Sequence, residues 1–119
     1  MRLEGYFNTN DEPAITLELN PGSIEVLIDT GFAGSLILPE HLAKGLTLHF
    51  DGFEEFFTVT GDLFVARSYS MDLEWLGGHV KIPVAVSQDV KEALLGGEML
   101  ENCVLTIDYE GRLVNIVRH

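Results

Sequence analysis

The chain has 119 residues and a mass of 13.2 kDa, which suits one domain and leaves no room for a second lobe. Its apolar fraction of 46% and charged fraction of 22% are ordinary for a globular protein and exclude disordered and fibrous classes. Seven basic and nineteen acidic residues give a formal net charge of −12, which argues against nucleic acids and anionic membranes as partners.

Short apolar runs between turn residues predict a single all-β domain over residues 1–119. In chain order, strands are expected at residues 14–19, 23–29, 54–60, 63–69, 72–76, 79–86, 103–109 and 112–117. The turn residues predict three hairpins, at Gly61-Asp62, Gly77-Gly78 and Glu110-Gly111. Short helices are expected at residues 39–44 and 97–102. The regular spacing of the strands indicates a closed or sandwich-like architecture.

The segment with the clearest chemical content spans residues 25–39. An apolar strand ends at Asp29-Thr30-Gly31, a loop of small residues follows, and a second apolar strand begins. Gly31 permits a close backbone approach, and the Thr30 hydroxyl can lock the turn. A carboxylate between apolar runs is costly to bury unless it is hydrogen-bonded or shares a proton. On these three residues alone, the simpler interpretation is that Asp29 caps a turn.

A second motif lies downstream, where the apolar pair Leu94-Leu95 is followed by Gly96 and a predicted short helix. Together with Asp29-Thr30-Gly31 and its apolar flanks, this motif resembles the retropepsin-like aspartic proteases of the single-domain microbial type. The resemblance covers about residues 20–109. It implies a closed β-barrel with one short helix near the C-terminus, in which Leu95 and Gly96 pack beside the active-site loop.

The same resemblance implies an aspartic endopeptidase without a cofactor. Such enzymes use two carboxylates that share one proton, one to activate a water and the other to polarise the scissile carbonyl. This chain has one Asp-Thr-Gly, and neither Asp62 nor Asp108 stands in a comparable loop. The second catalytic Asp29 would therefore come from another copy of the chain in a homodimer.

Supporting functions follow from the resemblance. Thr30 would make hydrogen bonds across the two-fold axis, and Gly31 would shape the loop. Thr60, Gly61 and Asp62 would form the tip of a flap that closes over an extended peptide or protein substrate.

Other motifs predict less. The four histidines have no metal-ligand spacing, so no metal site is expected. Ser35 does not lie in a Gly-x-Ser-x-Gly motif, which argues against Ser35 as a catalytic nucleophile. The aromatic run from Phe50 to Phe57 fits a substrate-lining surface, a core or a dimer contact. The alternative function is a non-catalytic β-barrel interaction module that keeps the aspartic-protease fold.

The sequence also predicts a cytoplasmic location. No apolar run approaches the roughly 18 residues of a membrane-spanning helix, and the residues after Met1 lack the apolar core of a signal peptide. The single cysteine, Cys103, excludes an intramolecular disulfide and is interpreted as a small buried hydrophobe.

Overall fold

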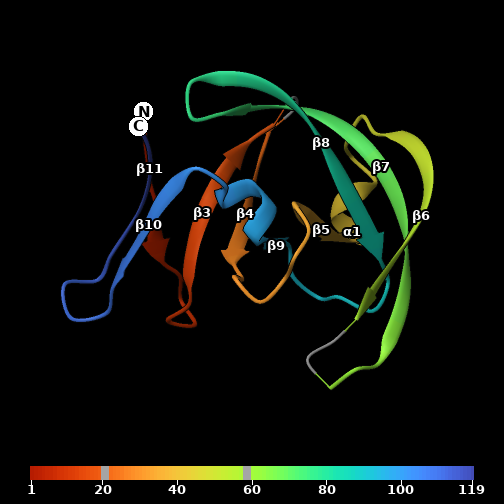
Figure 1. Cartoon of the computed structure of the whole chain (residues 1–119), viewed down its shortest axis with the longest axis horizontal. Helices are drawn as coiled ribbons and strands as arrows, with labels where there is room; N and C mark the ends of the chain where they lie inside the picture. The colour runs from red at the N-terminus through yellow and green to blue at the C-terminus, as the bar shows by residue number, and fades with distance from the viewer. Residues whose placement is uncertain (20–21, 58–59) are drawn as a thin grey trace.

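The computed structural model describes residues 1–19, 22–57 and 60–119, and most of them lie in strands (Figure 1). The strands are β1 (Arg2–Glu4), β2 (Tyr6–Phe7), β3 (Pro13–Glu18), β4 (Ser23–Ile28), β5 (Leu36–Pro39), β6 (His49–Phe57), β7 (Leu63–Trp75), β8 (Gly78–Ser87), β9 (Leu94–Leu95), β10 (Cys103–Asp108) and β11 (Leu113–Arg118). The helices are α1 (Glu40–Ala43) and the 3-10 helix η1 (Gly97–Leu100). The all-β prediction is confirmed, and the helix expected near the C-terminus is a single 3-10 turn.

The strands form two sheets. A three-stranded sheet has the order β1-β11-β10, and an eight-stranded sheet has the order β2-β3-β4-β9-β5-β8-β7-β6. The short strand β9 pairs in parallel with β4 and antiparallel with β5, so it joins two halves of the larger sheet. No pairing joins the outer strands β2 and β6 among the described residues, and the closed barrel therefore stays a prediction.

The long strand β7 replaces two expected strands. Its N-terminal part pairs with β6 and its C-terminal part with β8, and the two pairings overlap between Arg67 and Ser70. Residue exposure alternates along most of β7, so the chain continues straight through the position where a break was expected. Strand β6 begins earlier than expected, at His49, and ends at Phe57. The last residues of the expected strand include 58 and 59, which lie outside the described residues.

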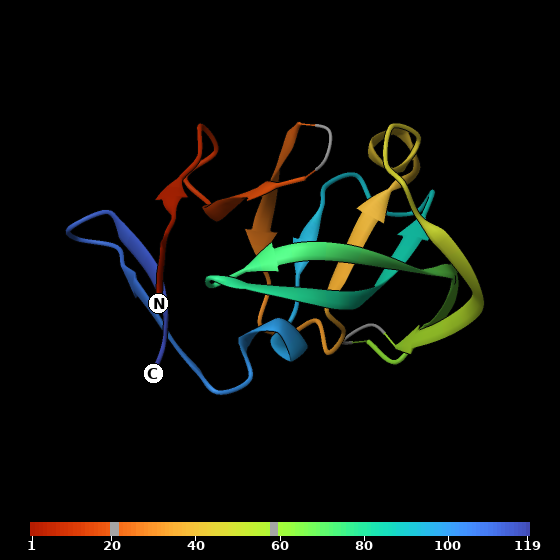
Figure 2. The same cartoon turned by 90° about the horizontal axis from the view of Figure 1, so that it is seen from above.

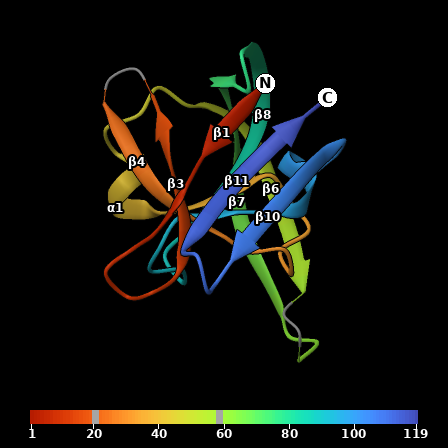
Figure 3. The same cartoon turned by 90° about the vertical axis from the view of Figure 1, so that its left-hand side faces the viewer.

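The terminal strands pair within one chain. Strand β1 lies antiparallel to β11, and Figure 3 shows the two ends of the chain side by side. The Met1 amino group donates to the Arg118 carbonyl at 3.1 Å, and the Arg118 N–H donates to the Met1 carbonyl at 3.0 Å. The three-stranded sheet is thus completed without a second chain.

The main core is formed by strands of both sheets. Its fully buried members come from seven strands: Ile15, Val26, Leu36, Leu38, Leu73, Val84, Leu95 and Ile116. Cys103 is half-buried rather than buried, and it packs against this core. None of the helices in the described ranges is long and apolar enough to cross a membrane. Because Val26, Leu36 and Leu95 are all in this core, burial of apolar surface fixes β4, β5 and β9 around the loop after β4.

Candidate active site

The loop after β4 turns sharply at Asp29. The Gly31 N–H donates to Oδ1 of Asp29 at 3.0 Å, and the Phe32 N–H donates to the Asp29 carbonyl at 3.1 Å. This pattern is an Asx turn, in which the aspartate side chain fixes the backbone two residues further on. The side chain is half-buried, and the described residues provide no partner for Oδ2. One carboxylate oxygen therefore holds the turn, and the other is available.

Strand β9 and helix η1 hold this loop from the other side. The Asp29 N–H donates to the Leu95 carbonyl at 2.9 Å, and the Gly96 N–H donates to the Ser35 carbonyl at 2.9 Å. The Gly97 N–H donates to the Phe32 carbonyl at 2.8 Å. Leu95 and Gly96 thus lie directly against the segment that carries Asp29, and backbone hydrogen bonds fix the position of the carboxylate.

Gly96 makes this close approach possible. A Cβ atom at residue 96 would lie 2.1 Å from the Gly34 carbonyl oxygen and 2.6 Å from the Phe32 carbonyl oxygen. Both distances are well inside van der Waals contact, and backbone oxygens have no rotamer with which to move away. Only glycine fits this position in the present arrangement.

The other residues expected at the site lie on the same side of the molecule. Thr30 and Gly31 are exposed in the loop after β4. Thr60, Gly61 and Asp62 are exposed in the turn between β6 and β7, where Thr60 Oγ1 donates to Asp62 Oδ2 at 3.1 Å. In Figure 2, η1, the loop after β4 and the start of β7 lie from left to right along the lower side of the molecule.

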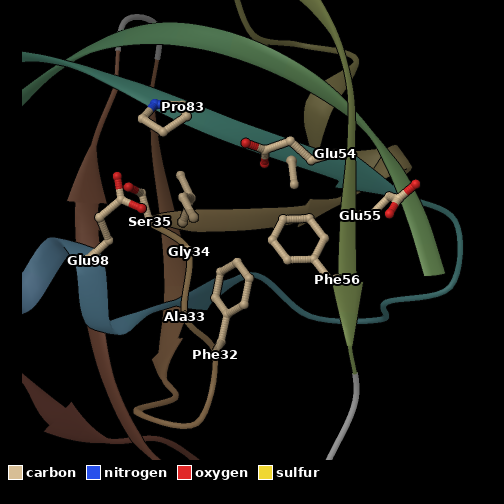
Figure 4. A pocket seen from close by; sticks show the side chains of 11 residues that line it. Phe32, Ala33, Gly34, Ser35, Glu54, Glu55, Phe56, Pro83 and Glu98 are labelled. Atoms are coloured by element: carbon tan, nitrogen blue, oxygen red, sulfur yellow. The ribbon is translucent and has the colours of Figure 1, made fainter. Parts of the chain in front are cut away.

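A pocket of about 310 Å³ lies between the loop after β4 and strand β6 (Figure 4). Phe32 and Ser35 of the loop line one side, Glu54 and Phe56 of β6 line another, and Glu98 of η1 contributes from a third. The rings of Phe32 and Phe56 are 5.4 Å apart at an angle of 57°. No sequence motif predicted this pocket. Its only signal was the aromatic run of β6.

That aromatic run divides between two faces. Phe56 turns inward and contacts both Phe32 and Phe64. Phe50, Phe53 and Phe57 are more than half exposed, at 57%, 69% and 73%. The aromatic run was expected to line a substrate surface, form a core or make a dimer contact. Phe56 is the aromatic residue of the run that lines the pocket.

The described ranges hold no group of three or more histidine, cysteine, aspartate or glutamate side chains placed to bind a metal ion. The loop itself offers a carboxylate, a threonine hydroxyl and backbone amides.

Comparisons with known proteins define the fold. No protein-family model matches the chain, and no curated protein matches it. The crystal structure of a retropepsin-like aspartic protease from Rickettsia conorii superposes with a TM-score of 0.62 at 23% identity, and the match covers 98% of this chain and 90% of that one. EIAV protease in complex with the inhibitor HBY-793 superposes with a TM-score of 0.61 at 21% identity, over 80% of this chain and 90% of that one.

The chain therefore has a retropepsin-like fold, as its sequence resemblance implied. Both of these structural neighbours are proteases, and the first is an aspartic protease.

Proposed function

We propose that the protein is an aspartic endopeptidase whose active form is a homodimer with one Asp29 from each chain. The observation that carries the proposal is the setting of Asp29 in a retropepsin-like fold. The side chain stands at the end of a core strand, one of its oxygens is fixed by the Gly31 N–H, and Oδ2 has no partner among the described residues. A carboxylate that is held in one orientation with a free oxygen is suited to general acid–base catalysis.

The proposed reaction is peptide-bond hydrolysis. One Asp29 carboxylate takes a proton from a water as the water oxygen attacks the scissile carbonyl carbon, and the other gives its proton to the carbonyl oxygen. In the second step, the now ionised carboxylate takes a proton from one hydroxyl of the diol. The protonated one gives its proton to the nitrogen, and the C–N bond breaks. The pair ends as it began, with one proton between two carboxylates.

A second copy of the chain is the proposed source of the second carboxylate. Asp62 hydrogen-bonds to Thr60 at the β6–β7 turn, and Asp108 accepts the Gly111 N–H at 2.9 Å in the turn between β10 and β11. Both side chains are engaged in turns outside the loop after β4. Symmetric pairing of two identical loops would place two equivalent carboxylates on a two-fold axis.

The other expected site residues keep supporting functions in this proposal. The exposed Thr30 hydroxyl would donate to the partner loop across the axis, and Gly31 would hold the Asp29 carboxylate through its N–H. Leu95 and Gly96 would fix the loop from behind. Thr60, Gly61 and Asp62 would form the tip of the flap over a peptide or protein substrate.

The alternative is a non-catalytic interaction module with the same fold, in which Asp29 is only a turn cap. The hydrogen bond from the Gly31 N–H to the Asp29 carboxylate supports this alternative too, because a structural aspartate would make the same bond. A test must therefore separate the charge of Asp29 from its function as an acceptor.

The substitution Asp29→Asn makes this separation, because the amide oxygen can still accept the Gly31 N–H. Cleavage of a peptide library by the variant should fall by several orders of magnitude, since an amide cannot take up a proton from water. The melting temperature should be unchanged or slightly higher, since two neighbouring amides do not repel each other.

The matched control is Asp108→Asn, which alters an aspartate that also accepts the N–H of a following glycine but lies away from the loop. The control should keep full activity. Equal cleavage by the two variants, or a library that the wild-type protein leaves intact, would favour the non-catalytic alternative.

A further inference from the structure

The pocket between the loop after β4 and strand β6 stands next to the proposed catalytic residue. Its first wall begins at Phe32, three residues after Asp29, and continues along the same loop. A substrate presented to Asp29 would therefore place the side chain of a residue close to the scissile bond in this pocket. The chemistry of the pocket then decides which side chains are favoured.

The walls of the pocket are partly apolar. Phe32 and Phe56 contact each other at a tilted angle, and Phe56 in turn stacks on Phe64 with the ring centroids 5.4 Å apart. Pro83 of β8 lines the side of the pocket opposite Phe32 (Figure 4). Such a surface can pack the methylene groups of a long side chain, and aromatic rings also attract cations.

The charges of the pocket are all negative. Figure 4 shows Glu54 on one side of the pocket with its carboxylate directed inward, and Glu98 on the other side beside Ser35. No lysine or arginine lines the pocket, and neither glutamate forms an ion pair within the described ranges. Two carboxylates near an apolar surface, without a cation of the protein's own, favour a ligand that supplies one.

The inward orientation of Glu54 follows from the strand register. Glu54 is opposite Ala66, which is buried, whereas Glu55 is opposite Val65, which is 54% exposed. Side chains alternate between the two faces of a strand, so Glu54 faces the pocket and Glu55 lies at its rim with the carboxylate turned away.

An independent observation comes from Ser35. This residue is 4% exposed and lines the pocket, yet its hydroxyl has no hydrogen-bond partner in the described ranges. In the same ranges, no fully enclosed side-chain oxygen or nitrogen lacks a partner, so the Ser35 hydroxyl must open to the pocket. A hydroxyl that opens to the pocket and has no partner within the protein can accept a hydrogen bond from a ligand.

From these features we infer that the pocket binds a lysine or arginine side chain of the substrate. The methylene groups would lie on Phe32, Phe56 and Pro83, and the cationic end would donate to Glu54, Glu98 and the Ser35 hydroxyl. The inference rests on the proposed function for the position of the scissile bond. Because a symmetric dimer has two such pockets, basic residues would be favoured on both sides of the cleaved bond.

Binding can be measured apart from turnover. The probes are two fluorescent pools of degenerate decapeptides that carry either arginine or its neutral isostere citrulline at two fixed positions. Their affinities for the Asp29→Asn protein would be measured by fluorescence anisotropy at one salt concentration. We expect the arginine pool to bind about tenfold more tightly than the citrulline pool, because charge-assisted hydrogen bonds in a partly enclosed pocket are stronger than neutral ones.

Two variants then locate the effect. The double substitution Glu54→Gln with Glu98→Gln should bring the two affinities close together. The control Glu55→Gln removes a charge from the neighbouring residue of the same strand and should leave the preference nearly intact. Equal affinities of the Asp29→Asn protein for the two pools would overturn the inference, since the pocket would then not distinguish a cation from its neutral isostere. The same loss of preference in all variants would also overturn it, since general attraction to an acidic protein would then explain the preference.

Cleavage of a peptide library by the wild-type protein supplies the second readout. Enrichment of lysine and arginine beside the cleaved bonds, reduced by Glu54→Gln with Glu98→Gln, supports the inference. Cleavage without such enrichment overturns the inference and leaves the endopeptidase in place. A protein that prefers the arginine pool through Glu54 and Glu98 but cleaves nothing keeps the binding pocket and loses the proposed function.

Discussion

Replacement of Gly96 by alanine tests the contact between β9, η1 and the loop that carries Asp29. The new Cβ would lie 2.1 Å from the Gly34 carbonyl oxygen, 2.6 Å from the Phe32 carbonyl oxygen and 2.6 Å from Cδ2 of the Phe32 ring. The ring can rotate, but the two carbonyl oxygens belong to the backbone. The loop or the β9–η1 segment must therefore move away from the other.

The cost can be worked out from the hydrogen bonds that such a movement breaks. Gly96, Gly97 and Glu98 donate to the carbonyls of Ser35, Phe32 and Gly34, at 2.9, 2.8 and 3.3 Å. At about 1 kcal/mol for each bond, their loss reduces the free energy of unfolding by about 3 kcal/mol. For a domain of this size, that corresponds to a fall in melting temperature of about 12 °C.

The assay is thermal unfolding followed by circular dichroism, with urea unfolding as a second measure of stability, at equal protein concentrations. The control is Gly45→Ala, because a Cβ at residue 45 meets nothing within 4 Å. The control should melt close to the wild type. If Gly96→Ala also melts within a degree or so of the wild type, the close contact between Gly96 and the loop is wrong.

Two further predictions concern the mass of the proposed homodimer and the pH dependence of cleavage. Light scattering at tens of micromolar should report about twice the chain mass of 13.2 kDa, and added salt should tighten the dimer because it screens the repulsion between chains with a net charge of −12. A particle that stays monomeric at all salt concentrations would contradict the shared active site. Cleavage should be fastest in mild acid and fall as the pH rises, since ionisation of both Asp29 carboxylates removes the shared proton and makes the two loops repel each other. A rate that climbs steadily from about pH 5 to about pH 9 would indicate a histidine or cysteine base instead.

Local sequence patterns were sufficient for much of the fold. The alternation of Ile24, Val26 and Ile28 with Ser23 and Glu25 predicted β4, and the turn residues predicted the hairpins β7–β8 and β10–β11. The proline and glycine around residues 39–45 predicted α1. In each case, the signal lies within a few residues of the element that it predicts, so neighbours in the sequence are enough.

Other features depend on contacts between distant segments. Strand β9 has two residues, Leu94 and Leu95, which is too short for any periodicity, and its place between β4 and β5 is fixed by burial of Leu95. The pocket needed two pieces of information that the sequence does not carry: the register that sets Glu54 opposite Ala66, and the approach of Phe32 to Phe56. The Asp29 turn was recognisable, whereas the shape of the surface around it was not.

The pairing of β1 with β11 within one chain has a consequence for how activity could be controlled. Each chain completes its own terminal sheet, so this sheet does not need a strand from a partner. In the proposed homodimer, folding and association would then be separate equilibria, and only the second would depend on the concentration of the protein. Under the proposed function, dilution or a competing surface would switch off proteolysis by separating intact subunits. The dormant subunits would keep their cores covered and would regain activity as soon as two of them met again.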